Sequence, residues 1–138
     1  LPLDTVVPVG RGAAAFRVSN PIPIAQARFS AALEDIASVG VAEINRVVSD
    51  KVSRMIVLAD EFCVPVTCSR AQNERAGIVV LQPPADQLTV LTASLHNHGV
   101  TVTTRQGCVR LSAHVTTSEE TFEMLRSSFM SYASAVSA

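Results

Sequence analysis

Residues 98–120 read HGVTVTTRQGCVRLSAHVTTSEE, and this stretch decides the fold that the sequence predicts. Val100–Thr104 and Val109–His114 alternate apolar and polar residues, as half-buried strands do. Gln106-Gly107 between them is typical of a tight turn, so the two segments are expected to form an antiparallel hairpin. The sequence Thr117-Ser118-Glu119-Glu120 that follows has the capping-box pattern of a helix start.

The other predicted helices follow from apolar residues at steps of three and four, and the other strands from short apolar runs. In chain order the elements are a helix over Ile24–Ser38, a helix over Val41–Phe62, a strand within Ala76–Leu81, a helix over Asp86–His98, the two hairpin strands and a helix from Thr117. Cys63–Thr67 is an edge strand or a loop, because Pro65 cannot donate a ladder hydrogen bond. This order predicts an α+β domain, in which a small, three- to four-stranded, mainly antiparallel sheet has helices packed on one face.

The chain starts with LPLDTVVPVGRGAAAFRV, which carries Pro, Gly and small side chains with no helical period. We interpret residues 1–18 as an extended segment or linker and residues 19–138 as one domain. Ser19-Asn20-Pro21 marks the expected start of the first helix, because Pro is tolerated at the first helical position. So loose a start indicates that another part of a protein precedes the domain.

Composition excludes several classes of partner. The net charge is −1 at pH 7, which gives no electrostatic footprint for nucleic acid or an anionic membrane. The sequence has no run of 18 apolar residues and no basic, then apolar, N-terminus, so neither a membrane span nor a signal peptide is predicted. Three cysteines are too few for a secreted disulfide framework, and a cytoplasmic location is expected.

Arg110 is the first candidate binding residue. If the apolar residues of its strand face the core, alternation places Arg110, Ser112 and His114 together on the opposite face. A guanidinium in that position can bind a carboxylate bidentately. The same pattern also fits a solvated sheet face on which the Arg110 stem covers apolar neighbours, and spacing alone favours that alternative.

One segment of this chain resembles a known family signature. The segment is Arg105-x-Gly107-x-Val109-Arg110-Leu111-Ser112-x-His114, and a short polar stretch and an acidic helix start follow it. It is the C-terminal signature of class V aminotransferase-type enzymes, which depend on pyridoxal phosphate (PLP) and include cysteine desulfurases, kynureninases and C–S lyases. The order and spacing of the upstream helices also resemble the family, from about Phe16 onward. Within it, the Ala- and Arg-rich composition is similar to actinobacterial homologues, among which we favour the C–S lyase of ergothioneine biosynthesis.

The resemblance implies that the domain recognises an amino-acid substrate. Arg110 matches the family arginine that holds the substrate α-carboxylate, and Arg105 matches an arginine at the hairpin turn, a second anion contact. His114 and Ser112 would support Arg110 from the same face. PLP requires a lysine for its Schiff base, and Lys51, the only lysine, lies inside a long predicted helix, where we interpret it as a solvated surface residue. A large PLP-binding domain of the same protein would therefore supply the lysine and hold the cofactor, the intact enzyme would be a homodimer, and this chain alone would be inactive.

Two features depart from the family pattern. In cysteine desulfurases a reactive cysteine sits in a longer loop after the Arg-x-Gly turn, whereas Cys108 follows Gly107 at once. We therefore expect Cys108 to be a small buried residue without a persulfide-forming role. The family's Tyr-Asn pair is also missing after His114, so no contact is transferred from that stretch.

Two other classes of function stay open. Cys63, Cys68, His96 and His98 carry zinc-binding atoms, although Cys-x4-Cys and His-x-His are loose spacings for a structural zinc site. The other alternative is a stand-alone binding or oligomerisation module without catalysis. Its support is the apolar stripe of the last predicted helix, which would give a partner a patch to bind.

Overall fold

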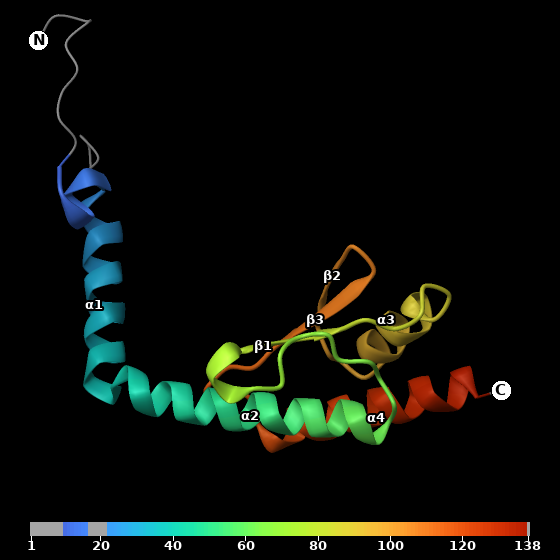
Figure 1. Ribbon diagram of the computed structural model, residues 1–138. Coiled ribbons are helices and arrows are strands. Elements are labelled where there is room, and N and C mark those ends of the chain that lie inside the picture. The colour runs from blue at the N-terminus through green and yellow to red at the C-terminus, as the bar shows by residue number, and fades with distance from the viewer. Residues whose placement is uncertain (1–9, 17–21, 138) are drawn as a thin grey trace, which may run out of the picture. The chain divides into compact units, whose positions relative to one another are not determined.

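The computed structural model describes residues 10–16 and 22–137. The chain divides into two compact units at the Val39–Gly40 junction. The described part of the first unit holds a short 3-10 helix, Gly12–Phe16, and helix α1, Pro23–Val39 (Figure 1). α1 takes the place of the predicted first helix, whereas the predicted start at Ser19-Asn20-Pro21 lies outside the described residues.

The second unit carries the sheet and the core. Its elements are α2 (Val41–Glu61), a 3-10 helix (Gln72–Glu74), β1 (Ile78–Leu81), α3 (Leu88–Asn97), β2 (Thr103–Arg105), β3 (Cys108–Ser112) and α4 (Glu119–Val136). The predicted order of helices and strands is therefore confirmed. So is the predicted class, because the described residues form an α+β structure with four α-helices and a three-stranded antiparallel sheet.

The sheet has the order β1-β3-β2, so β3 is its central strand. β3 pairs with β1 through Val80 opposite Arg110, and with β2 through Thr103 opposite Arg110. The segment after α2 adds one isolated antiparallel bridge, Val66 to Leu81, as expected for an edge segment that contains a proline.

Both hairpin strands are shorter than predicted. β2 does not begin at Val100, because the Val100 N–H donates to the Leu95 carbonyl (2.9 Å) and closes the end of α3. β3 ends at Ser112, because the His114 N–H donates to the Thr117 hydroxyl (2.9 Å) as the chain turns toward α4. Local side-chain and helix-end hydrogen bonds thus compete with the ladder at both ends.

The hairpin turn has the chemistry that the sequence predicts. Gln106 and Gly107 both have positive φ, 51° and 77°. Two positive φ values in a two-residue loop are those of a type I′ turn, whose twist matches that of the strands. Because this turn joins Arg105 directly to Cys108, it sets which face of the sheet carries Arg110.

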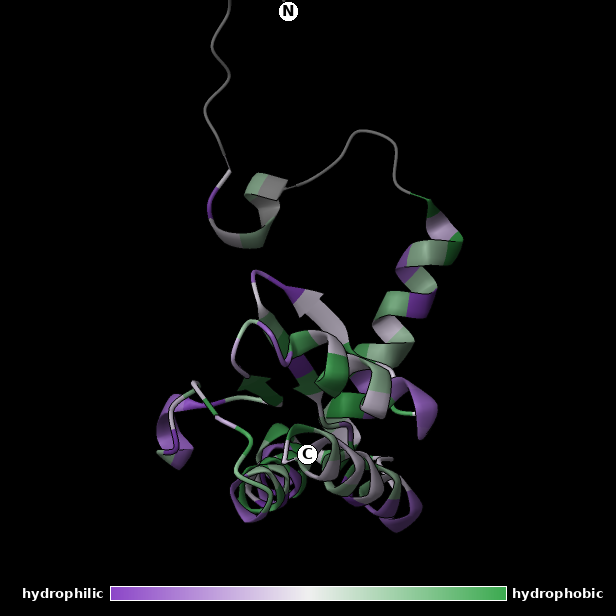
Figure 2. Ribbon diagram, turned by 90° about the vertical axis from the view of Figure 1, so that its right-hand side faces the viewer, coloured by the Kyte–Doolittle hydropathy of each residue, from purple (hydrophilic) through white to green (hydrophobic). Residues whose placement is uncertain are grey.

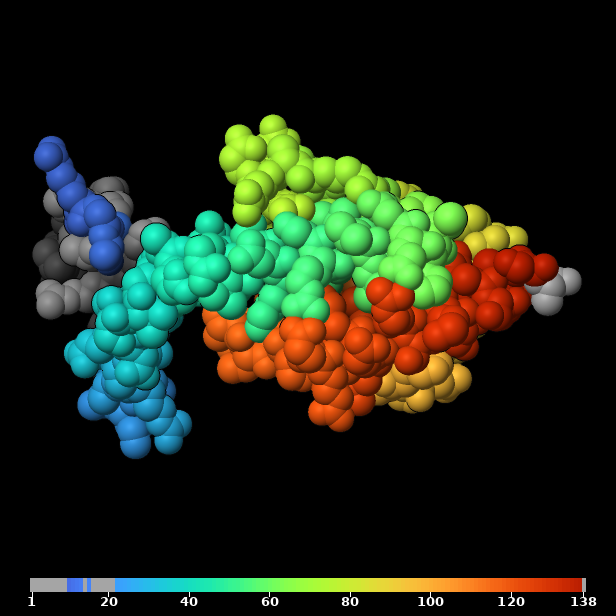
Figure 3. Space-filling view, turned by 90° about the horizontal axis from the view of Figure 1, so that it is seen from below, coloured from blue at the N-terminus to red at the C-terminus, as the bar shows by residue number. Residues whose placement is uncertain are grey.

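A single core lies between the sheet and the helices of the second unit. β1 and β3 turn alternate residues inward, and these are fully or almost fully buried: Val79, Leu81, Val109 and Leu111. α2 and α4 lie side by side beneath the sheet (Figures 1 and 3). Figure 2, which views these two helices nearly end-on, shows hydrophilic residues on their outer sides and hydrophobic residues toward the sheet.

The start of α4 differs from the prediction by one residue. The N-cap is Ser118, whose hydroxyl accepts from the Thr121 N–H (3.3 Å), and not Thr117. The third helical residue is consequently Thr121, so no glutamate stands where a capping box needs one. Glu119 and Glu120 still lie in the first turn, where their charge favours the positive end of the helix dipole.

The end of α2 predicts a stabilising substitution. Cys63 has a φ of 54°, and the Val64 N–H reaches back to the Ala59 carbonyl (2.8 Å), as in a Schellman motif. Since this left-handed position favours glycine and the Cys63 side chain is exposed, we expect Cys63→Gly to raise the free energy of unfolding by about 0.5–1 kcal/mol. Urea denaturation measures the change, and Cys63→Ala, which keeps the Cβ atom, is the control. A Gly variant less stable than the Ala variant would contradict the prediction.

Candidate functional site

Arg110 lies at the centre of the sheet with its side chain exposed. It sits between two inward-facing residues of β3, so it points to the face opposite the core. Its cross-strand neighbours are Val80, which is half-buried, and Thr103, which is exposed. The predicted alternation of buried and exposed residues around Arg110 is therefore confirmed.

The arginines of the second unit fall into two groups. Four form ion pairs with carboxylates: Arg46 with Glu43 and Asp50, Arg54 with Glu119, Arg70 with Asp60, and Arg126 with Glu61. A fifth, Arg75, donates to the Ser53 hydroxyl. Arg105 and Arg110 have no hydrogen bond or ion pair from their side chains within residues 10–16 and 22–137. Their two positive charges are thus available to an anion from outside the described structure.

Arg105 and Arg110 share one face of the hairpin. Arg105 pairs with Cys108, which is two residues from Arg110 on β3, so the two arginines are diagonal neighbours. The Cα atoms of diagonal neighbours are about 7–8 Å apart, within the combined reach of two arginine side chains. Because like charges repel at that distance, the pair gains when an anion binds between them.

Ser112 and His114 do not reach Arg110 through hydrogen bonds. Ser112 is exposed on the Arg110 face, opposite Ile78 of β1. His114 lies beyond the end of β3, where its Nδ1 atom is 2.8 Å from the Thr116 hydroxyl and accepts from the Thr116 N–H. The structure therefore does not show Ser112 or His114 hydrogen-bonded to Arg110, as we had expected. Their contact with a substrate stays a prediction.

Lys51 corrects another expectation. Its ammonium is not simply solvated, since it donates to the carbonyls of His114, Val115 and Thr117, at 3.2, 2.6 and 2.7 Å. The sequence holds a signal for this position: Lys51 lies three residues after Val48 and four before Met55, on the flank of the core stripe of α2. That flank brings the residue to the segment between β3 and α4.

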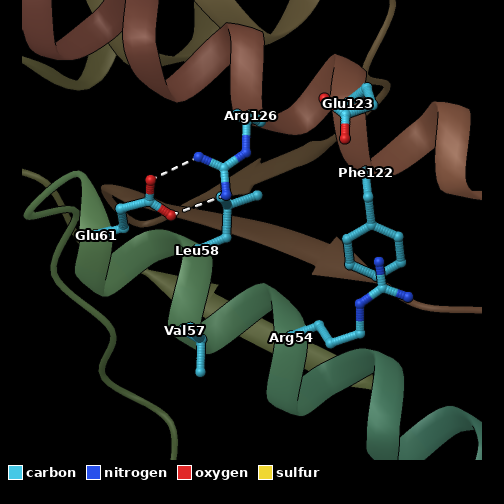
Figure 4. A pocket seen from close by; sticks show the side chains of 7 residues that line it. All are labelled: Arg54, Val57, Leu58, Glu61, Phe122, Glu123 and Arg126. Atoms are coloured by element: carbon cyan, nitrogen blue, oxygen red, sulfur yellow. Dashed lines mark hydrogen bonds and ion pairs between the residues drawn. The ribbon is translucent and has the colours of Figure 1, made fainter.

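A groove between α2 and α4 is lined by the charged residues Arg54, Glu61, Glu123 and Arg126 (Figure 4). At one end the Arg54 guanidinium lies 4.0 Å from the centre of the Phe122 ring and pairs with Glu119. At the other end Arg126 pairs with Glu61 through two hydrogen bonds. These hydrogen bonds hold the pKa of Glu119 and of Glu61 below their ordinary range. The cations of this groove are neutralised, so it offers an anion no unpaired charge.

A smaller pocket includes one of the predicted site residues. Its lining combines hydroxyl-bearing and apolar residues: Met55, Gly99, Val100, Thr101, Leu111, Ser112, Thr117, Thr121, Phe122 and Leu125. It lies at the end of the hairpin that β2 does not cover, because β2 starts only at Thr103. Because core residues such as Leu111 and Phe122 line this pocket, it lies on the inner side of the sheet, away from the face of Arg110.

The cysteines and histidines do not come together as metal ligands. Within residues 10–16 and 22–137 no group of three or more His, Cys, Asp or Glu residues could hold a metal ion. His98 is engaged instead with the Ser94 carbonyl, 2.8 Å from its Nδ1 atom. Cys63 is exposed, and Cys108 is half-buried where we expected it to be buried, because it lies on the outer face at the hairpin turn. The zinc alternative therefore has no ligand set in this part of the chain.

The contacts of Lys51 bear on the expected cofactor, PLP. The cofactor needs a lysine amine that is free to react, and the amine of the only lysine is bound by three carbonyls.

None of the helices in the described part of the chain is long and apolar enough to cross a membrane. Comparison of the chain with protein-family models, with curated proteins and with solved structures finds no match.

Proposed function

We propose that this chain is the substrate-recognition domain of a PLP-dependent enzyme of the class V aminotransferase type. The observation that carries the proposal is the exposed Arg110 guanidinium, which has no partner in the described residues while four other arginines of its unit are paired with carboxylates. Binding by Arg110 would fix the α-carboxylate of an amino-acid substrate through two parallel N–H···O bonds. Arg105, on the same face, would contact a second anionic oxygen.

The cofactor belongs to another part of the enzyme in this proposal. A large PLP-binding domain of the same protein supplies the reactive lysine and the wall of the pocket that faces Arg110. PLP provides the electron sink for breaking bonds at the substrate α- or β-carbon, and this domain orients the substrate against it. The intact enzyme is then a cytoplasmic homodimer, a location that three free cysteines support.

Cys108 favours C–S lyase chemistry over persulfide transfer. It directly follows a two-residue turn and pairs with Arg105 in the sheet, so it has no flexible loop with which to carry a thiolate to a substrate. We therefore prefer a lyase that cleaves the C–S bond of a cysteine-derived substrate. In such a lyase Arg110 binds the substrate carboxylate from the outer face of the sheet.

The test is to produce the chain together with the reading frame upstream of it. The longer protein is expected to bind PLP, seen by its visible absorbance, and to release a sulfur product from a cysteine conjugate. The chain of 138 residues is expected to do neither. A longer protein that binds no PLP would overturn the proposal.

A second candidate is an interaction module, and one observation on α1 favours it. The apolar stripe of α4 that suggested a patch is buried in the core, so that support is wrong. α1 instead leaves Phe29, Leu33 and Ile36 exposed along one helical face, at fractions of 66%, 48% and 43%.

If α1 mediates self-association, the molar mass in solution should exceed that of one chain. Leu33→Glu should then reduce it, because the substitution places a charge in the apolar stripe. Light scattering on the eluted protein measures this, with Arg28→Glu as a control for added acidic charge on the same helix. A monomeric wild-type chain would remove this candidate.

A further inference from the structure

Three backbone carbonyls converge on one cation, the ammonium of Lys51. They belong to His114, Val115 and Thr117, and all three lie within 3.2 Å of the Lys51 Nζ atom. An ammonium has three N–H donors and no acceptor, so each of its donors has a partner here. The arrangement links α2 to residues 63 to 66 positions later in the chain.

The segment that supplies these carbonyls has no ladder or helix of its own. It lies between the last residue of β3 and the N-cap of α4. Carbonyl dipoles that point at one position repel one another, so a positive charge at that position stabilises this backbone conformation. It adds to the turn's own hydrogen bonds, in which the Thr117 N–H donates to the His114 carbonyl and the His114 N–H to the Thr117 hydroxyl. The neighbouring Arg54–Glu119 ion pair holds α4 to α2 but does not contact these carbonyls.

We infer that these three carbonyls form a site for a monovalent cation of ammonium size, and that Lys51 fills the site with its own side chain. The tethered cation stabilises the conformation of residues 114–117, together with the hydrogen bonds within that segment. Lys51 is thus a positioning residue for the segment that carries His114 and that starts directly after the strand of Arg110. The inference concerns the fold of this chain and does not depend on the proposed enzymatic function.

Two substitutions separate the charge from the space it occupies. Lys51→Ala removes the side chain and leaves room for a free cation. Lys51→Met removes the charge but keeps most of the stem in place. Both variants are expected to lower the thermal midpoint by roughly 5–10 °C, because charged hydrogen bonds are lost from a unit of about 100 residues.

Ammonium chloride is the probe, compared at equal ionic strength with choline chloride, whose cation is too large for the site. Lys51→Ala is expected to regain about half or more of its lost thermal midpoint in ammonium chloride. Lys51→Met is expected to regain none, because its stem fills the site. Arg46→Ala, which breaks an exposed ion pair elsewhere on α2, is the control and should respond equally to the two salts.

Three results would overturn the inference: a Lys51→Ala variant as stable as the wild type, an equal gain for it in both salts, or the same ammonium-specific gain for Lys51→Met. Should Lys51→Ala be unfolded in choline chloride, the folded fraction is measured by circular dichroism. Refolding in ammonium chloride alone then supports the site, and failure to refold in either salt counts against it.

Discussion

If the proposed function holds, Arg110→Ala is expected to lower kcat/KM of the proposed PLP-dependent enzyme by about 30- to 1,000-fold. The loss corresponds to about 2–4 kcal/mol of charged hydrogen bonding between the guanidinium and the substrate carboxylate. The effect should be large because Arg110 has no carboxylate partner among the described residues, so its charge is not already neutralised. Steady-state kinetics on the longer protein, with the proposed PLP-binding domain, measure it.

Arg46→Ala is the matched control for the Arg110 variant. It removes a guanidinium from the same unit, but one that is exposed on α2 and paired with Glu43 and Asp50. We expect its kcat/KM to stay within about twofold of the wild type, since exposed ion pairs contribute little. Arg110→Lys should recover only part of the lost activity, because an ammonium cannot bind a carboxylate in the bidentate way. Wild-type kcat/KM for Arg110→Ala would refute the assignment.

Phe129→Ala should reduce the free energy of unfolding by about 3–5 kcal/mol. Phe129 is completely buried on α4, and its ring lies 6.4 Å from that of Phe62 at the end of α2. The substitution loses the transfer free energy of the ring and leaves a cavity at the place where the two helices meet. Urea or thermal denaturation of the chain measures the loss.

Met130→Ala is the control for Phe129→Ala. Met130 is the next residue on α4, and its side chain is 51% exposed. Its truncation should change the free energy of unfolding by less than about 1 kcal/mol. Equal losses for the two variants would show that α4 does not pack as described.

The parts of the fold that the sequence predicts are those set by local chemistry. The type I′ turn needs only Gln106-Gly107, and the two strands beside it follow from simple alternation. α2 and α4 follow from apolar stripes that are continuous along each helix. The exposure of Arg110 follows in the same way, because it alternates with the buried residues Val109 and Leu111.

The parts that the sequence does not predict depend on contacts between distant segments. The three carbonyls that bind Lys51 lie more than 60 residues away in the chain, so no local pattern marks that lysine as bound. His114 would continue the alternation of β3, but side-chain hydroxyls of Thr116 and Thr117 turn the backbone out of the sheet first. The burial of the α4 stripe likewise depends on α2, α3 and the sheet meeting around it.

The central place of β3 has a consequence for how a ligand would be recognised. The main chain at Arg110 is flanked on both sides by paired strands, so its Cα atom has almost no freedom to shift when an anion arrives. Only the side-chain torsions of the arginine are left to be ordered, at about 2 kcal/mol or less. A receptor built on an edge strand or a loop would also lose backbone entropy on binding, whereas here that entropy is lost when the domain folds.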